Sequence, residues 1–244
     1  MNPIDEYESD FLLAIPCYRE GKRLPPFLEE LVTEVRDCPF SVKIQIVDDG
    51  SPEPEQSEFT KKIEAFRERC PEISETLAYS PNRGKGYAIG YAWNEASARY
   101  LAFIDADGSI SARDAARIMK TVFDAKDDSK LVIATRRGSD ALVKRSLGRR
   151  VISWLFNKLL RIRYDLEISD TQCGFKIVPS SFYRQFQSNF RQERFAFDIE
   201  LILKAHEAGL SIEEIPVDWQ EKPNGTLRFA DGLSLYWDVL MKRI

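Results

Sequence analysis

Short apolar runs alternate with longer amphipathic stretches along the first 135 residues of the chain. Continuous apolar runs of this length predict buried, mainly parallel strands. They cover residues 11–16, 42–47, 73–79, 100–105 and 130–135. Because helical patterns lie between these runs, the sequence predicts an α/β fold in which helices flank an open sheet.

The helical stretches carry apolar residues at three- and four-residue steps. The first has two prolines near its start, and its apolar residues are Leu24, Phe27, Leu28, Leu31, Val32 and Val35. Residues 87–98 and 111–123 behave alike. Beyond residue 136 a basic helical segment and an irregular stretch precede one more strand and helix, without a repeat or a clear linker. We therefore expect a single domain over residues 1–244.

Composition and charge exclude several classes of protein. The 244 residues are 43% hydrophobic and 30% charged, which fits a globular domain and excludes a disordered chain. A net charge of -4 argues against a generally basic nucleic-acid-binding protein, so no nucleic-acid partner is expected. The single histidine, His206, argues against a histidine-based triad and a multi-histidine metal site. Carboxylates and cations must therefore carry the chemistry, and His206 is expected at a surface or a helix end.

Cysteine spacing and hydropathy indicate the compartment. The four cysteines, at positions 17, 38, 70 and 173, form no C-x-x-C pair, which favours free thiols in a reducing compartment. No run approaches the ~18 apolar residues of a membrane-spanning helix, and the acidic N-terminus is unlike a secretory signal. These features predict a cytoplasmic protein.

Two aspartates at the end of the fourth predicted strand are the sharpest chemical feature. Asp105 and Asp107 are one residue apart and are followed by Gly108. Two such carboxylates can bind one hard divalent cation, and phosphate oxygens typically complete its coordination shell. The alternative is an ordinary Asp-Gly turn that caps the next helix. The pattern predicts a site for Mg²⁺ or Mn²⁺ and a diphosphate.

The second predicted strand ends in a parallel acidic motif. Asp48 opens the sequence DDGS there, where an acidic side chain can accept hydrogen bonds from a base N–H or ribose hydroxyls. A tight turn is the alternative interpretation. Between the two acidic edges, residues 82–86 (NRGKG) form a glycine-containing loop before a helix, and Lys85 supplies one of its two cations. Such a loop suits an anion beside exposed backbone N–H groups.

Together these segments resemble the family 2 glycosyltransferases of the GT-A type. The likeness rests on IPCYREG at 15–21, VDDGS at 47–51, NRGKGYAIGYA at 82–92 and DADG at 105–108. It implies a Rossmann-like, mainly parallel mixed sheet, with a nucleotide-sugar-binding half over residues 1–135 and an acceptor-binding half over residues 136–244. It also implies the donor contacts: Pro16, Tyr18, Glu20 and Asp48 around base and ribose, Asp105 and Asp107 at the metal and diphosphate, and Lys85 as a further contact.

Motifs in the second half resemble a subgroup that acts on lipid phosphates. DTQCGFK at 170–176, FAFDIEL at 195–201 and EEIPVDW at 213–219 are similar to dolichyl-phosphate β-glucosyltransferases and their bacterial polyprenyl-phosphate relatives. Many related mannosyltransferases have DADLQ where this chain has DADGS. Ser109 therefore stands at the position of a glutamine near the metal, which favours a glucosyl donor and leaves the third protein ligand open.

The resemblance also assigns residues to the acceptor. Arg136 and Arg150 correspond to the family's pair of arginines and would hold the acceptor phosphate, with Arg137 and Arg149 as alternatives. Asp170 opens the DTQCGF motif and is the candidate catalytic or sugar-orienting carboxylate. A capping role, or a buried ion pair with Lys176, is the alternative for Asp170.

Two further motifs receive roles from the same resemblance. Lys222 and Arg228 flank a Pro-Asn-Gly segment that is similar to the family's loop closing on the donor diphosphate, although a solvated loop is the alternative. Asp198 and Glu200 in FAFDIEL are expected to support the structure rather than to contact substrate.

The segment from Lys144 to Arg163 is basic and amphipathic. Its 20 residues hold seven lysines and arginines, no acidic residue, and many apolar side chains. This composition is typical of a helix at an anionic lipid surface, where each cation contributes about 1 kcal/mol, while a core-packing helix is the alternative. We expect this helix to hold the protein peripherally at the inner face of the membrane.

These features together predict an inverting, metal-dependent hexosyltransferase. It would move glucose from a nucleotide sugar, a UDP-sugar in preference to a GDP-sugar, to a polyprenyl or dolichyl phosphate. Such a phosphate, with a second pKa of about 6, is largely dianionic at neutral pH and needs no strong general base. Two alternatives stay open: a soluble family 2 transferase acting on a polysaccharide or glycan hydroxyl, and a catalytically inactive sugar-nucleotide-binding protein. The sequence leaves the oligomeric state undetermined.

Overall fold

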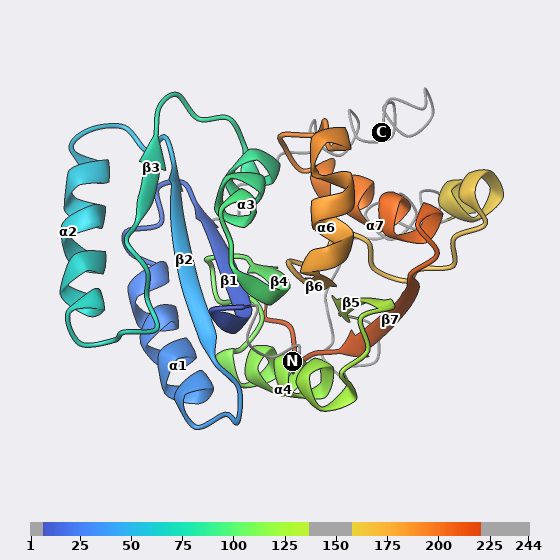
Figure 1. The fold of residues 1–244 in the computed structure, drawn as a ribbon. Coiled ribbons are helices and arrows are strands. Elements are labelled where there is room, and N and C mark those ends of the chain that lie inside the picture. Colours follow the sequence, from blue (N-terminus) through green and yellow to red (C-terminus); the bar gives the residue numbers. More distant parts are fainter. Residues whose placement is uncertain (1–6, 137–157, 221–244) are drawn as a thin grey trace.

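The computed structural model describes residues 7–136 and 158–220, which form a seven-stranded sheet flanked by helices. The strands are β1 (Ser9–Cys17), β2 (Val42–Asp49), β3 (Leu77–Tyr79), β4 (Ala98–Ile104), β5 (Lys130–Thr135), β6 (Phe175–Pro179) and β7 (Ser211–Pro216). Their order is β3-β2-β1-β4-β6-β5-β7 (Figure 1). Among these strands only β6 runs antiparallel to its neighbours, so the sheet is mixed and mainly parallel, as predicted.

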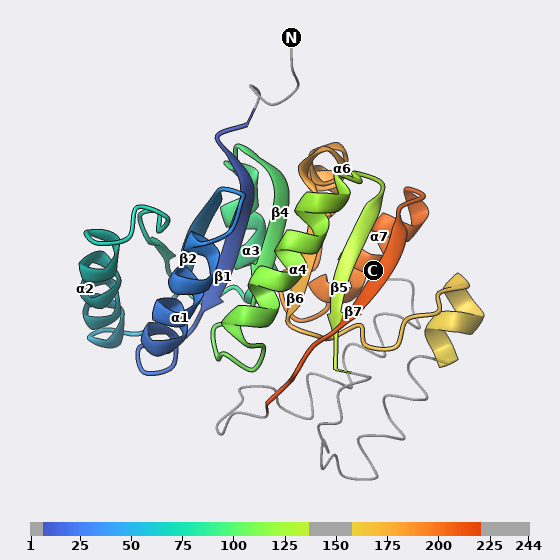
Figure 2. The same ribbon diagram turned by 90° about the horizontal axis from the view of Figure 1, so that it is seen from below.

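Helices cover both faces of this sheet. One core layer is formed by α1 (Leu24–Arg36), α2 (Glu55–Arg67) and α4 (Ala112–Ala125). The other is formed by α3 (Lys85–Asn94), α6 (Ser180–Phe186) and α7 (Phe197–Glu207). Figure 2 shows α4 and α3 on opposite sides of the strands. Because successive residues of β1 enter opposite layers, Leu13 one and Leu12 the other, the strand reads as a continuous apolar run.

Two predicted elements differ from the observed ones. The strand expected over residues 73–79 is reduced to β3, with an isolated bridge at Ile73 before it. Between the bridge and β3, the side-chain amide of Gln45 donates to Glu75 O at 2.7 Å and takes the place of a backbone partner. The helix expected over residues 87–98 is α3, which ends at Asn94 because Ala98 already pairs with Ser9 in the sheet. The other predicted strands and helices that lie within the described ranges agree with the structure to within a few residues.

The topology brings segments of both halves of the chain to one edge of the sheet. β1, β2 and β4 are parallel and end there, with Cys17 opposite Asp48. β6 begins at the same edge because it is antiparallel, with Ile104 opposite Phe175. The chain after β7 returns across this edge, where Trp219 forms a bridge with Ile110 (Figure 2). Residues from distant parts of the sequence therefore meet at the carboxyl ends of the strands.

Several smaller predictions are also tested by the fold. All four cysteines are free, and Cys17 and Cys173 are buried. His206 is exposed in the last turn of α7, as expected. Among the residues that the structure describes, no helix is both long and apolar enough to cross a bilayer.

Candidate active site

Asp105 and Asp107 lie in the loop that follows β4, and both side chains are partly exposed. Asp107 Oδ1 accepts a hydrogen bond from Ser109 N at 2.9 Å, so the Asp-Gly turn considered as an alternative is present beside the acidic pair. Lys85 Nζ lies 2.8 Å from Asp105 Oδ1. Burial raises the pKa of Asp105, and the positive charge of Lys85 opposes this rise. The loop therefore presents two carboxylates with one ammonium close to them.

Gly174 allows the DTQCGFK motif to pack directly against Asp105. Asp105 N donates to Gly174 O at 2.9 Å where β4 meets β6. A Cβ atom at position 174 would lie 2.0 Å from Asp105 Oδ2, which is too close for two atoms that are not bonded. Only glycine fits here without moving the carboxylate. The sequence analysis missed this role of Gly174. The signal that could have revealed it is the place of this glycine within the DTQCGFK motif.

The acidic pair fits a divalent cation that takes its other ligands from phosphate. Within residues 7–136 and 158–220 no group of three or more His, Cys, Asp or Glu side chains could hold a metal ion. The backbone of Ser109 is engaged on both sides, since its N–H donates to Asp107 and its carbonyl accepts from Gln220 N at 3.0 Å. When phosphates and water complete the coordination shell of Mg²⁺ or Mn²⁺, a protein typically supplies one or two carboxylates, as this loop does.

Asp48 is fully buried at the end of β2 and has one oxygen without a partner. Its Oδ1 accepts from Ser51 N at 2.9 Å, which forms the tight turn that was the alternative interpretation. Its Oδ2 has no hydrogen-bond partner in the described part of the chain. Buried acceptors are normally paired, so this oxygen marks a place for a donor from outside the described residues. A base N–H or a ribose hydroxyl is such a donor.

The other predicted base and ribose contacts lie at the end of β1 and in the loop that follows. Pro16 is opposite Val47, and Tyr18 exposes its ring. Glu20 is buried and accepts from Arg23 Nε at 2.7 Å. Burial raises the pKa of Glu20, Arg23 opposes the rise, and the nearby Asp107 and Asp105 add to it. The structure therefore brings these residues to the same edge as the acidic pair.

The loop at residues 82–86 has two N–H groups that are already paired within the protein, so its use by an anion stays a prediction. Asp49 accepts from Arg83 N at 2.7 Å and from Gly84 N at 2.8 Å. Just beyond the loop, Tyr87 N donates to Glu193 O at 2.9 Å. That same oxygen would lie 2.6 Å from a Cβ atom at position 84, so this glycine admits a crossing chain segment. Of the two adjacent aspartates, the resemblance assigned a nucleotide contact to Asp48 alone, and the contacts of its neighbour Asp49 are with this loop.

Lys85 is the member of this loop that reaches the acidic pair. Its Nζ lies between Asp105 and Asp198, 2.8 Å from the first carboxylate and 3.1 Å from the second. Burial lowers the pKa of Lys85, but the two carboxylates outweigh burial and raise it. Burial acts to raise the pKa of Asp198, yet Lys176 and Lys85 hold it below its usual value. Asp198 therefore contacts two lysines, and its role stays a prediction.

Asp170 is buried and forms a two-pronged ion pair with Arg136. Arg136 Nε and Nη2 each donate to one oxygen of this carboxylate at 2.6 Å. The alternative pairing of Asp170 with Lys176 is wrong, because Lys176 pairs with Asp198 instead. Glu214 of β7 holds the loop in place by accepting from Asp170 N at 3.1 Å. Two residues predicted for the acceptor half thus contact each other directly.

Several predicted residues lie outside the described ranges. They are Arg137, Arg149, Arg150, Lys222, Arg228 and most of the basic segment 144–163. The described end of that segment, residues 158–163, is helical. It carries Ile162 with 74% of its surface exposed, and Arg161 pairs with Glu167 at 2.7 Å.

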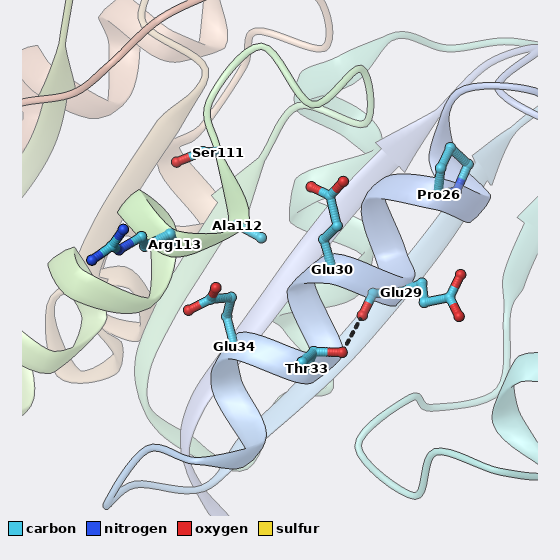
Figure 3. A pocket seen from close by; sticks show the side chains of 8 residues that line it. All are labelled: Pro26, Glu29, Glu30, Thr33, Glu34, Ser111, Ala112 and Arg113. Atoms are coloured by element: carbon cyan, nitrogen blue, oxygen red, sulfur yellow. Dashed lines mark hydrogen bonds between the residues drawn. The ribbon is translucent and has the colours of Figure 1, made fainter.

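A groove of about 450 Å³ between α1 and α4 lies apart from these residues. Glu29, Glu30 and Glu34 of α1 line it together with Arg113 of α4. Figure 3 shows that the three carboxylates point in different directions. None of the predicted site residues lines the groove, so it is not part of the candidate site.

A family model and several known proteins match most of this chain. The model for "Glycosyl transferase family 2" matches residues 13–186. The chain is 29% identical to dolichyl-phosphate beta-glucosyltransferase of Dictyostelium discoideum over 99% of this chain and 76% of that protein. It is 30% identical to the protein of the same name in Drosophila melanogaster, over 97% and 75%.

A solved structure is similar in fold. Glucosyl-3-phosphoglycerate synthase from Mycobacterium tuberculosis, in complex with Mn²⁺, UDP and glucosyl-3-phosphoglycerate, has a TM-score of 0.66 at 14% identity. The match covers 96% of this chain and 78% of that chain. At this identity the likeness concerns the arrangement of helices and strands.

Proposed function

The chain belongs to glycosyl transferase family 2, and from this premise we propose that it transfers glucose from UDP-glucose to a polyprenyl phosphate, with inversion. Its mixed, mainly parallel sheet has the GT-A architecture. The observation that carries the proposal is the arrangement of residues at one edge of the sheet. Asp105 and Asp107 lie there between Asp48, which would contact the nucleotide, and the ion pair of Arg136 with Asp170, which would contact the acceptor. Two relatives that match nearly the whole chain are named dolichyl-phosphate beta-glucosyltransferase.

The donor would bind across the ends of β1, β2 and β4. Asp48 Oδ2, which has no partner among the described residues, would accept a hydrogen bond from the base or ribose. Asp105 and Asp107 would hold Mg²⁺ or Mn²⁺, which when bound neutralises charge on the departing diphosphate. A structurally similar enzyme contains both Mn²⁺ and UDP, which supports this choice of donor and ion.

The acceptor phosphate would lie beside Arg136. The guanidinium is held by Asp170 and stacks against Trp219 at 5.4 Å, so its orientation is fixed before the acceptor arrives. One phosphate oxygen attacks the anomeric carbon, the bond from that carbon to the UDP oxygen breaks on the opposite face, and both electrons of that bond leave with UDP. Because the phosphate is already anionic, no side chain has to remove a proton in this step.

The lipid acceptor would be reached at a membrane surface. The exposed Ile162 lies among the cations Lys158, Arg161 and Arg163, a combination that suits contact with anionic headgroups. We propose that the cytoplasmic face of the membrane is where this contact occurs.

A panel of acceptors tests the proposal most sharply. The protein is incubated with Mn²⁺ and UDP-glucose and with a short polyprenyl phosphate, the matching polyprenol without phosphate, or an oligosaccharide. We expect lipid-linked glucose with the phosphate alone, and less product when GDP-mannose or UDP-N-acetylglucosamine replaces UDP-glucose. Transfer to the oligosaccharide with none to the polyprenyl phosphate would favour the hydroxyl acceptor. Neither transfer nor release of UDP would favour a binding protein.

A further inference from the structure

Four side chains of alternating charge lead from the acidic pair into the core. Asp105 contacts Lys85, Lys85 contacts Asp198 at 3.1 Å, and Asp198 contacts Lys176. Exposure falls along this order: 43% for the side chain of Asp105, 11% for Lys85, 1% for Asp198 and 0% for Lys176. The chain of charges thus has one end at the metal site and the other end where water does not reach.

Each of these residues comes from a different element. Asp105 follows β4, Lys85 begins α3, Asp198 lies in the first turn of α7, and Lys176 lies in β6. Both ammonium groups lie near the ring of Phe103, 4.6 Å from its centre for Lys85 and 5.3 Å for Lys176. In such poorly hydrated surroundings each charge depends on its direct partners, so removing one partner alters the next contact.

We propose that Asp198 is a positioning residue that shares the ammonium of Lys85 with Asp105 and so sets how tightly the acidic pair binds its divalent cation. This inference rests on the proposed function. One ammonium group lies between two carboxylates, and a metal ion at Asp105 competes with it for the same oxygens. Asp198 offers Lys85 a second partner during that competition. The positive charge of Lys176 partly neutralises Asp198 and so limits how strongly Asp198 attracts Lys85.

The arrangement predicts opposite effects for two variants of one buried ion pair. In Asp198→Asn, Lys85 keeps Asp105 as its one charged contact among the described residues, so Mn²⁺ binding should weaken by about tenfold. In Lys176→Met, Asp198 attracts Lys85 more strongly and leaves Asp105 freer, so Mn²⁺ binding should tighten severalfold. A pair that only stabilised the fold would affect metal binding in the same direction in both variants.

Direct measurement of Mn²⁺ binding tests this without turnover. Free Mn²⁺ is titrated by electron paramagnetic resonance at a fixed concentration of UDP, with UDP alone as the blank and no acceptor present. Lys204→Met is the matched control, because Lys204 lies on α7 and pairs with Glu200 at 3.7 Å, outside this chain of charges. Both charge variants are also made in a Lys85→Met background, where the shifts should vanish. Circular dichroism verifies that each variant is folded.

Opposite shifts that vanish without Lys85 would support the inference. Shifts in one direction, or shifts of unchanged size in Lys85→Met, would overturn it while leaving the metal site of the proposed function intact. Absence of Mn²⁺ binding by the unaltered protein would overturn the metal site and this inference together. If a single variant does not fold, Lys176→Met with Asp198→Asn removes both buried charges at once. It should bind Mn²⁺ more weakly than the unaltered protein, and unchanged binding would contradict the role of Asp198.

Discussion

At Gly174 the missing side chain determines where Asp105 can place its carboxylate. Because a Cβ atom there would lie 2.0 Å from Asp105 Oδ2, Gly174→Ala should displace the carboxylate and lower transfer by about 100-fold. Gly90→Ala is the control, since its Cβ atom would lie 3.5 Å from Tyr183 Oη, an ordinary contact. Initial rates of glucosyl transfer measure both. Near-normal activity in Gly174→Ala would show that this contact does not position Asp105.

The unpaired oxygen of Asp48 leads to a second prediction at this scale. Asp48→Asn keeps an oxygen that can accept from Ser51 N, but it replaces the buried Oδ2 with an NH₂ group. This NH₂ group would then face an N–H or O–H group of the nucleotide, and the two cannot form a hydrogen bond. Affinity for UDP should fall by about 10- to 100-fold, the cost of one mispaired buried group. Calorimetric titration with UDP measures it, and Asp10→Asn, which lies on β1 away from the site edge, is the control. Unchanged affinity would contradict the contact.

The sequence assigns residue chemistry where a short motif has a recognisable use. The D-x-D pair at a strand end predicts a cation site at Asp105 and Asp107, which stays a prediction. Asp48 and Asp49 are adjacent and identical, and the contacts of the folded chain show that Asp49 is paired with the loop at residues 82–84, whereas Asp48 Oδ2 has no partner among the described residues. Long-range pairs such as Lys176 with Asp198 leave no local pattern to find.

Among the elements, the strands were more predictable than their ends and directions. Continuous apolar runs found β1, β2, β4 and β5, because each is covered on both faces by helices. The antiparallel direction of β6 has no counterpart in periodicity, since apolar alternation is the same in both directions. Gln45 shortens β3 through a side-chain hydrogen bond that no local pattern reveals.

An ion pair between α1 and the segment before β3 predicts a pH dependence of stability. Arg36 donates to Glu72 at 3.0 and 3.2 Å, and these bonds hold the pKa of Glu72 below its usual range. Because the folded pKa is the lower one, the pair stabilises the fold above the unfolded pKa of about 4.3 and loses this effect as the pH falls through the folded pKa. Glu72→Gln should therefore lower Tm slightly at neutral pH and not in strong acid. Equal losses in thermal melts at both pH values would contradict this.

For the whole molecule, the sequence resemblance predicted the class of fold and the family, and both are confirmed. A net charge of -4 coexists with a basic segment, so average charge alone does not describe the surface. The division into a donor half and an acceptor half stays a prediction, as do the roles of Arg150, Lys222 and Arg228.

The proposed membrane contact would involve the whole molecule, and it is tested on vesicles. Lys158→Gln with Arg163→Gln should weaken binding to anionic vesicles by about fivefold per charge, because each cation contributes about 1 kcal/mol. Lys43→Gln with Lys61→Gln removes two exposed cations elsewhere and should leave binding unchanged. Co-sedimentation with vesicles that contain phosphatidylserine measures the partition. Equal losses in both double variants would indicate general charge attraction instead of a defined contact.

The proposed function depends on two carboxylates after β4 that bind a divalent cation together with the nucleoside diphosphate. Asp107→Asn tests it with little disturbance, because asparagine can still accept from Ser109 N, whereas Asp105 also pairs with Lys85. The measurement is calorimetric binding of UDP with and without Mn²⁺, with Asp124→Asn on the exposed face of α4 as the control. Mn²⁺ should tighten UDP binding in the unaltered protein and the control but not in Asp107→Asn. An equal effect of Mn²⁺ in all three proteins would contradict this proposal.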